Sequence, residues 1–230
     1  MPEAAPMFRS LALAAAVVPG CLAAACPEDA MLVFDGSRSM ANVGNFDTGE
    51  SRIVAARRAL AEAVPPISDE RRVGFVVYGP GGRHSCDGLD LRFGPRADAA
   101  AAIIEGVRDL APDGATALTE GVRLAVDALG GPEVPGTVVL VTDGQETCGG
   151  LPCDLAARLA GGALTVHVIG FDIPKNLLAA PGMVEGPQLT AGDLPSRCLA
   201  DLTGGLYVTT EGVDQLVAAL EWTLGCPLRF

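Results

Sequence analysis

Short apolar runs alternate with segments of helical period along most of this chain. Five runs have the length and apolar content of buried strands, and they cover residues 30–34, 73–78, 137–142, 164–171 and 206–209. Strands separated by helical segments are typical of βαβ units, in which the strands run parallel. The pattern therefore predicts an α/β fold with a doubly wound, mostly parallel sheet and helices on both faces.

The segments between these runs have the pattern of amphipathic helices. The first of them, at residues 53–64, places its apolar residues on one helical face, and Pro65-Pro66 is expected to end it. Further helices are expected at residues 97–110, 118–129, 193–202 and 213–224.

A turn at residues 79–82, with the sequence Gly-Pro-Gly-Gly, reverses the chain toward residues 89–93. A sixth strand, antiparallel and at the sheet edge, is therefore expected there. With the Rossmann-like strand order 3-2-1-4-5-6, the first and fourth strands are central neighbours whose connections leave in opposite directions. Open α/β sheets bind ligands in that crevice. The Pro- and Gly-rich segment at 173–194 is either a recognition loop or a surface insertion.

The first 25 residues have the composition of a signal peptide. They contain two charges, Glu3 and Arg9, followed by an apolar run that is short and interrupted by Pro and Gly. The small residues just before Cys26 are suited to a signal peptidase, so we expect a signal peptide over 1–25 and one mature domain over 26–230. Lipidation of Cys26 or Cys21 is the alternative. Secretion into a bacterial periplasm or medium is the expected localisation.

Net charge and cysteine content indicate which class of partner is unsuitable and which cross-links to expect. The formal net charge of −12 makes nucleic acid an unsuitable partner. Six cysteines follow the leader, an even number in a chain expected to reach an oxidising compartment, so disulfides are predicted. We expect Cys148–Cys153 to close a short loop and Cys26–Cys226 to join the termini, which leaves Cys86 and Cys198 without an assigned pairing. His84 and His167 lack the spacing of zinc ligands, and His167 is expected to be a core or rim residue.

Five oxygen-bearing residues at three separated points have the composition of one divalent-cation site. They are Asp35, Ser37 and Ser39, then Thr116, then Asp143. Both carboxylates directly follow predicted strands, and Thr116 precedes a predicted helix. Hard cations such as Mg2+ prefer carboxylate and hydroxyl oxygens to sulfur or imidazole. We therefore predict Mg2+, or Mn2+ or Ca2+, at the carboxyl edge of the sheet.

The same five residues carry a resemblance to the von Willebrand factor A (VWA) domain family. Its metal-ion-dependent adhesion site (MIDAS) reads Asp-x-Ser-x-Ser, then Thr, then Asp, and the likeness runs from about residue 28 to 224. The resemblance implies that the three hydroxyls meet the metal and that the two carboxylates act directly or through water. Arg38 departs from the Gly that many bacterial relatives have at this position.

The resemblance implies a secreted adhesion or assembly module that uses its metal to capture an acidic residue of a partner protein. Neutral hydroxyl ligands leave the charge of the cation poorly compensated, which favours such a carboxylate. One alternative is a structural metal with the binding surface on the 173–194 segment. A metal-assisted hydrolase is another, but the sequence offers no suitable base, no nucleophile elbow and no phosphate-binding loop. We therefore expect a protein that is not an enzyme.

Overall fold

The computed structural model describes residue 1, residue 26 and residues 28–46, 48–173 and 195–226. The sheet has six strands, as the sequence predicts, and its order is β3-β2-β1-β4-β5-β6, the order assumed for the ligand crevice. Five strands are parallel, and β3 alone pairs antiparallel, with β2. The bounds are β1 (Asp29–Asp35), β2 (Val73–Tyr78), β3 (Asp90–Arg96), β4 (Gly136–Thr142), β5 (Leu164–Phe171) and β6 (Tyr207–Thr210).

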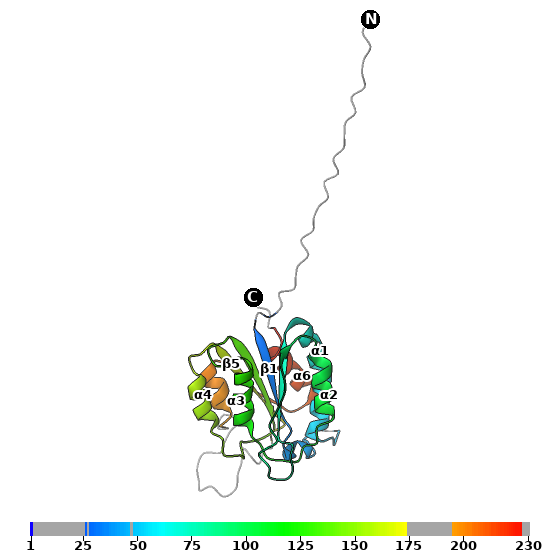
Figure 1. Cartoon of the computed structure of the whole chain (residues 1–230). Helices are drawn as coiled ribbons and strands as arrows, with labels where there is room; N and C mark the ends of the chain where they lie inside the picture. Colours follow the sequence, from blue (N-terminus) through cyan, green and yellow to red (C-terminus); the bar gives the residue numbers. More distant parts are fainter. Residues whose placement is uncertain (2–25, 27, 47, 174–194, 227–230) are drawn as a thin grey trace.

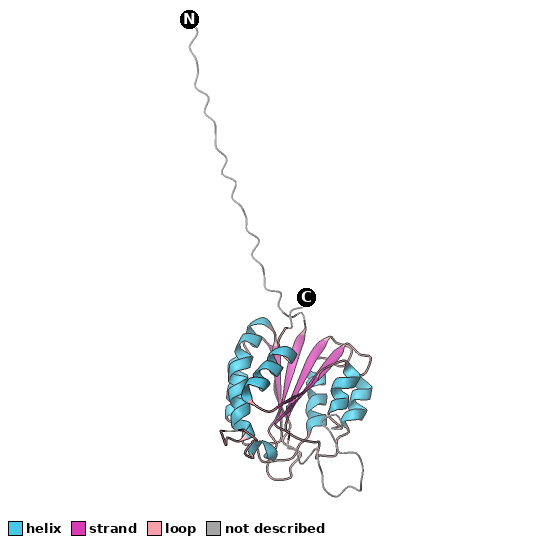
Figure 2. Ribbon diagram, turned by 180° about the vertical axis from the view of Figure 1, so that it is seen from behind, coloured by secondary structure: helices cyan, strands magenta, loops and turns pink. Residues whose placement is uncertain are grey.

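Helices cover both faces of this sheet (Figures 1 and 2). On one face lie α1 (Arg52–Glu70), α2 (Ala100–Arg108) and α6 (Val213–Thr223). On the other lie α3 (Leu118–Ala128), α4 (Pro152–Leu159) and α5 (Arg197–Thr203). A short 3-10 helix, η1 (Arg38–Ala41), follows β1. Residues of β1, β2 and β4 are buried on both faces, because each central strand is covered by helices twice.

The first helix does not end where the sequence predicted. It continues through Pro65 and Pro66 to Glu70. Proline has a φ close to the helical value. Inside a helix it is unfavourable mainly because it removes one backbone hydrogen bond and its ring clashes with the carbonyl four residues earlier. The turn beyond the prolines buries Ile67 in the core, and Arg71 N–H closes the helix on the Ile67 carbonyl at 3.0 Å. Burial of that last turn offsets the helix-breaking tendency. The helix α4 was not predicted at all.

The described residues form three disulfides, and these correct the predicted pairing. Cys26–Cys226 is confirmed, but Cys148 pairs with Cys86 and Cys153 pairs with Cys198. The Cys148–Cys153 prediction was wrong because Pro152 begins α4. Cys153 therefore lies on a helix packed against α5, which carries Cys198, while Cys148 remains in the loop after β4.

Some of the predicted segments include residues that the structure does not describe. The proposed signal peptide at 1–25 lies there except for Met1, as does most of the 173–194 segment and the first part of the helix expected at 193–202. Among the described residues, no helix has both the length and the apolar character needed to span a membrane. Three disulfides favour an oxidising, extracytoplasmic compartment.

Removing the bridge between the termini should lower global stability. Cys26 and Cys226 are separated by 200 residues, and they lie before β1 and after α6. The chain-entropy model gives such a loop about 4–5 kcal/mol of stabilisation. We expect Cys26→Ala/Cys226→Ala to lower the free energy of unfolding by about that amount in urea denaturation. A loss below about 1 kcal/mol would contradict the assigned pairing, since the bridge would then constrain little of the unfolded chain.

His167 has a structural position, as the sequence predicted. It lies in the middle of β5, opposite Val139 of β4, and its Nδ1 accepts a hydrogen bond from Leu206 N–H at 2.9 Å. Burial, and secondly the charge of Arg71, lower the pKa of His167 to about 4. The imidazole is therefore neutral in the folded protein at neutral pH.

A folded-state pKa below the unfolded value of about 6.5 means that His167 stabilises the fold fully above that pH. This contribution is lost as the pH falls from about 6.5 to about 4. After allowance for partial exposure, we expect a loss of about 1–2 kcal/mol by urea denaturation. His167→Asn keeps an acceptor for Leu206 and removes the titration, so its loss over the same range should be smaller. If the wild type and His167→Asn lose equal unfolding free energy over this pH range, the pH dependence does not come from His167.

Candidate metal centre

The candidate centre lies at the carboxyl ends of β1 and β4, which are adjacent and parallel. The chain leaves β1 toward α1 on one face and leaves β4 toward α4 on the other. This is the arrangement in which an open α/β sheet forms a ligand crevice. Asp35 is the last residue of β1, and Asp143 directly follows β4.

Asp35 is completely buried and accepts two hydrogen bonds. Ser37 N–H donates to its Oδ1 at 2.7 Å, and the hydroxyl of Thr142 donates to its Oδ2 at 2.6 Å. Burial raises the pKa of Asp35 above its usual range, while these hydrogen bonds act in the opposite direction. The carboxylate is thus fixed in orientation at the end of the strand.

Ser37, Ser39 and Asp143 form a continuous chain of side-chain contacts. The two serine hydroxyl oxygens are 3.0 Å apart, and the Ser39 hydroxyl donates to Asp143 Oδ1 at 2.6 Å. Burial, and secondly the charge of Asp35, raise the pKa of Asp143 to about 7. Two carboxyl groups that disfavour each other's ionisation mark a position suited to a compensating cation.

Thr116 is brought to the same edge by its backbone. Thr116 N–H donates to the Thr147 hydroxyl at 2.8 Å, and Thr147 N–H donates to the Thr116 carbonyl at 2.9 Å. On the other side, Arg38 N–H donates to the Gly114 carbonyl at 2.9 Å, which joins this loop to the Asp-x-Ser-x-Ser segment. The Thr116 side chain is buried, and within the described chain it has no hydrogen bond to the other four residues.

The loops around these residues are held by contacts that the sequence pattern did not reveal. The N-cap of α3 is Ala117, which has no side-chain oxygen, and Glu146 supplies one instead by accepting from Thr119 N–H at 2.9 Å. Its other oxygen accepts from Cys148 N–H at 2.8 Å. Cys148 is in turn bonded to Cys86 in the loop after β2. The loops after β2 and β4 and the first turn of α3 are therefore tied together beside the candidate ligands.

Gly79 allows the end of β2 to approach this group. Its φ is +108°, and a side chain there would collide with the backbone of Gly36 and Ser37. Only glycine combines that dihedral with so close an approach. The signal in the sequence was the Gly-Pro-Gly-Gly turn, which predicted the reversal but not the contact.

Arg52 is the most important neighbour missed by the sequence analysis. It begins α1 and is 5% exposed, and its Nη1 lies 3.5 Å from Asp143 Oδ2. Its Nε donates to Asp172 Oδ2 at 2.7 Å. The helical pattern of 53–64 started one residue later, and no local motif indicated that this guanidinium would reach the strand ends. Arg38, by contrast, is exposed.

The side chains fit a hard divalent cation. Asp143 Oδ2 is buried and has no hydrogen-bond partner among the described residues. In the described part of the chain, no group of three or more His, Cys, Asp or Glu is placed to hold a metal. The donors at the strand ends are instead two carboxylates together with serine and threonine hydroxyls. Such a donor set suits Mg2+, Mn2+ or Ca2+ better than a cysteine- or histidine-bound metal.

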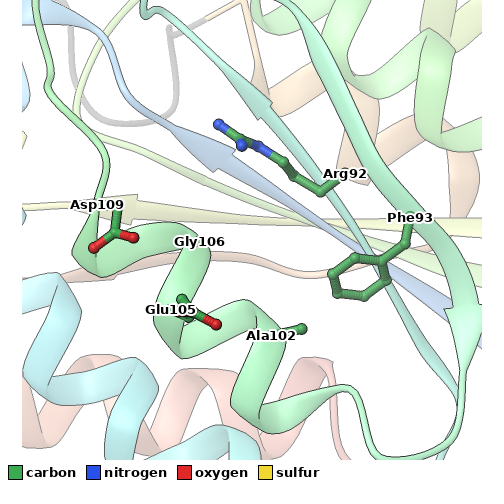
Figure 3. A pocket seen from close by; sticks show the side chains of 6 residues that line it. All are labelled: Arg92, Phe93, Ala102, Glu105, Gly106 and Asp109. Atoms are coloured by element: carbon green, nitrogen blue, oxygen red, sulfur yellow. The ribbon is translucent and has the colours of Figure 1, made fainter.

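A separate hollow of about 320 Å³ lies between β3 and α2 (Figure 3). Its charged side chains already have partners. Glu105 and Asp109 both pair with Arg108, at 3.2 and 3.0 Å, and Arg92 pairs with Asp90 at 2.9 Å. Its polar groups are exposed and paired, whereas the strand-end cluster contains a buried carboxylate oxygen, Asp143 Oδ2, that accepts no hydrogen bond from the described residues.

Comparison with known proteins identifies relatives of this chain in sequence and in fold. YwmC of Bacillus subtilis is 27% identical over 158 residues, which are 65% of this chain and 68% of YwmC. The structure of BatB from Bacteroides thetaiotaomicron superposes with a TM-score of 0.62 at 21% identity, covering 86% of this chain and 97% of BatB.

Proximal thread matrix protein 1 from the mussel byssus, in a structure with a zinc-occupied MIDAS motif, gives a TM-score of 0.54 at 19% identity. That alignment covers 86% of this chain and 47% of the mussel protein. At these identities the two solved structures support the fold. The sequence profile of the von Willebrand factor type A domain matches residues 30–145, about half of the chain. This chain belongs to the von Willebrand factor type A domain family.

Proposed function

We propose that this protein is a secreted binding module that holds a divalent metal and uses it to capture an acidic residue of a partner protein. VWA domains generally mediate protein interactions or adhesion. The observation that carries the proposal is the buried Asp143 Oδ2, which accepts no hydrogen bond from the described residues although Arg52 Nη1 lies 3.5 Å away, and which lies beside a chain of serine hydroxyls. A cation there would satisfy a buried acceptor that no hydrogen bond satisfies.

Mg2+ is the proposed metal, with Mn2+ and Ca2+ as alternatives. Ser37, Ser39 and Thr116 would offer hydroxyls, and Asp35 and Asp143 would offer carboxylates directly or through water. When bound, the metal supplies a poorly compensated positive charge, since three of the five ligands are neutral. The zinc-occupied MIDAS of the mussel relative supports metal binding at this motif.

Binding is favoured over catalysis by what surrounds the cluster. A hydrolytic role requires a base within reach of a metal-bound water. His167 lies mid-strand with its Nδ1 already bonded to Leu206, and His84 is exposed in the loop after β2. The alternative in which a structural metal supports binding through the 173–194 segment is separated from the main proposal by the experiments below.

Metal binding should depend on the strand-end cluster. We expect chelator-treated wild-type protein to bind one Mg2+, Mn2+ or Ca2+ in isothermal titration, and Asp35→Ala and Thr116→Ala each to abolish binding. Asp127→Ala and Thr209→Ala remove an exposed carboxylate and an exposed hydroxyl elsewhere and should bind like the wild type. Absence of binding by the wild type for all three cations would refute the proposed site.

Carboxylate capture can be tested without knowing the partner. With Mn2+ bound, acetate should show faster methyl-proton relaxation than acetamide, because only the anion coordinates the cation strongly. Thr116→Ala should lose this difference together with the metal. If Mn2+ binds but acetate and acetamide relax alike, the cation is inaccessible to carboxylates, and the structural-metal alternative replaces the proposal.

A further inference from the structure

Arg52 joins the candidate metal centre to the end of β5. Its Nη1 donates to the Ser39 carbonyl at 3.2 Å and lies 3.5 Å from Asp143 Oδ2. Its Nε donates to Asp172 Oδ2 at 2.7 Å and to the Asp172 carbonyl at 3.1 Å. Both carboxyl groups and the guanidinium are almost completely buried, so these charges interact with little screening by solvent.

Asp172 is itself held firmly by the loop after η1. Asn45 donates to it from Nδ2 at 2.8 Å and from its backbone N–H at 3.2 Å. Asp172 is 2% exposed and adopts a positive φ of 46°, an uncommon conformation for a residue other than glycine. The carboxylate behind Arg52 is therefore fixed, and it directs the guanidinium toward Asp143.

The position of Arg52 is unfavourable by local rules. It is the first residue of α1, where the helix dipole disfavours a cation, and the first turn contains no acidic residue. A buried arginine at the positive end of a helix requires compensation from elsewhere. Asp143 and Asp172 supply that compensation, so the placement of Arg52 makes physical sense only with respect to the strand-end carboxylates.

We propose that Arg52 is a resident counter-charge of the metal centre, which stabilises the buried Asp143 carboxylate when no cation is bound and thereby lowers metal affinity. The inference rests on the proposed function, because it assigns a role toward that metal. It makes Arg52 a positioning residue rather than a ligand.

The charge of Arg52 acts in opposite directions on the metal-free and metal-bound states. Without a cation, the buried Asp143 carboxylate is costly to hold in its charged form, and Arg52 Nη1 lies 3.5 Å from its Oδ2. Arg52 reduces that cost in the metal-free protein. With a cation bound, the same guanidinium is a like charge close to the metal and opposes it. Loss of Arg52 should therefore destabilise the metal-free state more than the metal-bound state.

The test uses Arg52→Gln/Asp172→Asn, which removes both members of the buried pair and avoids leaving Asp172 unpaired. In chelator, its melting temperature should fall below that of the wild type. Excess Mg2+ should raise it by more than it raises the wild type. By titration calorimetry, the Kd for Mg2+ should be about three- to tenfold lower than in the wild type. Arg52→Lys retains the charge and should stay near the wild-type values.

Arg57→Met is the matched control, because Arg57 is a partly buried arginine of the same helix that donates to the carbonyls of Val107 and Leu110, away from the centre. It should lower stability equally with and without Mg2+ and leave the Kd unchanged. A double variant that binds Mg2+ more weakly than the wild type would overturn the inference, since Arg52 would then help the metal to bind.

Failure of the proposed function is distinguishable from failure of this inference. If the wild type binds no cation, the proposed function fails, and stability in chelator still decides the role of Arg52. Asp143→Asn should then restore more stability to Arg52→Gln/Asp172→Asn than to the wild type, because it removes the uncompensated charge. Equal effects of Asp143→Asn in the two backgrounds would show that Arg52 is not its counter-charge.

Discussion

The burial of two carboxyl groups side by side is the constraint on which the rest of this structure depends. Asp35 and Asp143 end adjacent central strands, and both are almost fully removed from water. Isolated buried charges are very unfavourable, so each must be compensated by hydrogen bonds, by an opposite charge or by protonation. Ser37 N–H, the Thr142 and Ser39 hydroxyls and the Arg52 guanidinium all converge for this reason.

The strand order explains why these groups meet. β1 and β4 are neighbours, and the chain leaves them toward opposite faces, so their carboxyl ends border a crevice. The loops that border that space are held from several sides. Cys86–Cys148 joins the loops after β2 and β4, and paired hydrogen bonds between Thr116 and Thr147 join the latter to the start of α3. The candidate ligands thus lie on rigid supports, as a preorganised binding site requires.

Much of the fold was predictable from the sequence because the central strands are buried on both faces. Such strands appear in the sequence as continuous apolar runs of strand length. For this reason β2 and β5 were predicted with their observed bounds. The prediction failed where packing overrides local preference. Pro65 and Pro66 lie within α1 because the following turn buries Ile67, and α4 was missed because it follows a Gly- and Pro-rich segment typical of a loop.

The sequence by itself determined the strand-end placement of Asp35, Ser37, Ser39 and Asp143, since residues that end parallel strands must share one edge of the sheet. It also indicated Thr116, at the start of the helix that packs across β1 and β2. Only the tertiary structure decided the disulfide pairing of Cys86, Cys148, Cys153 and Cys198, and the roles of Arg52 and Asp172. These depend on distances between segments far apart in the chain, 120 residues for Arg52 and Asp172, and no local pattern of apolar and polar residues encodes such distances.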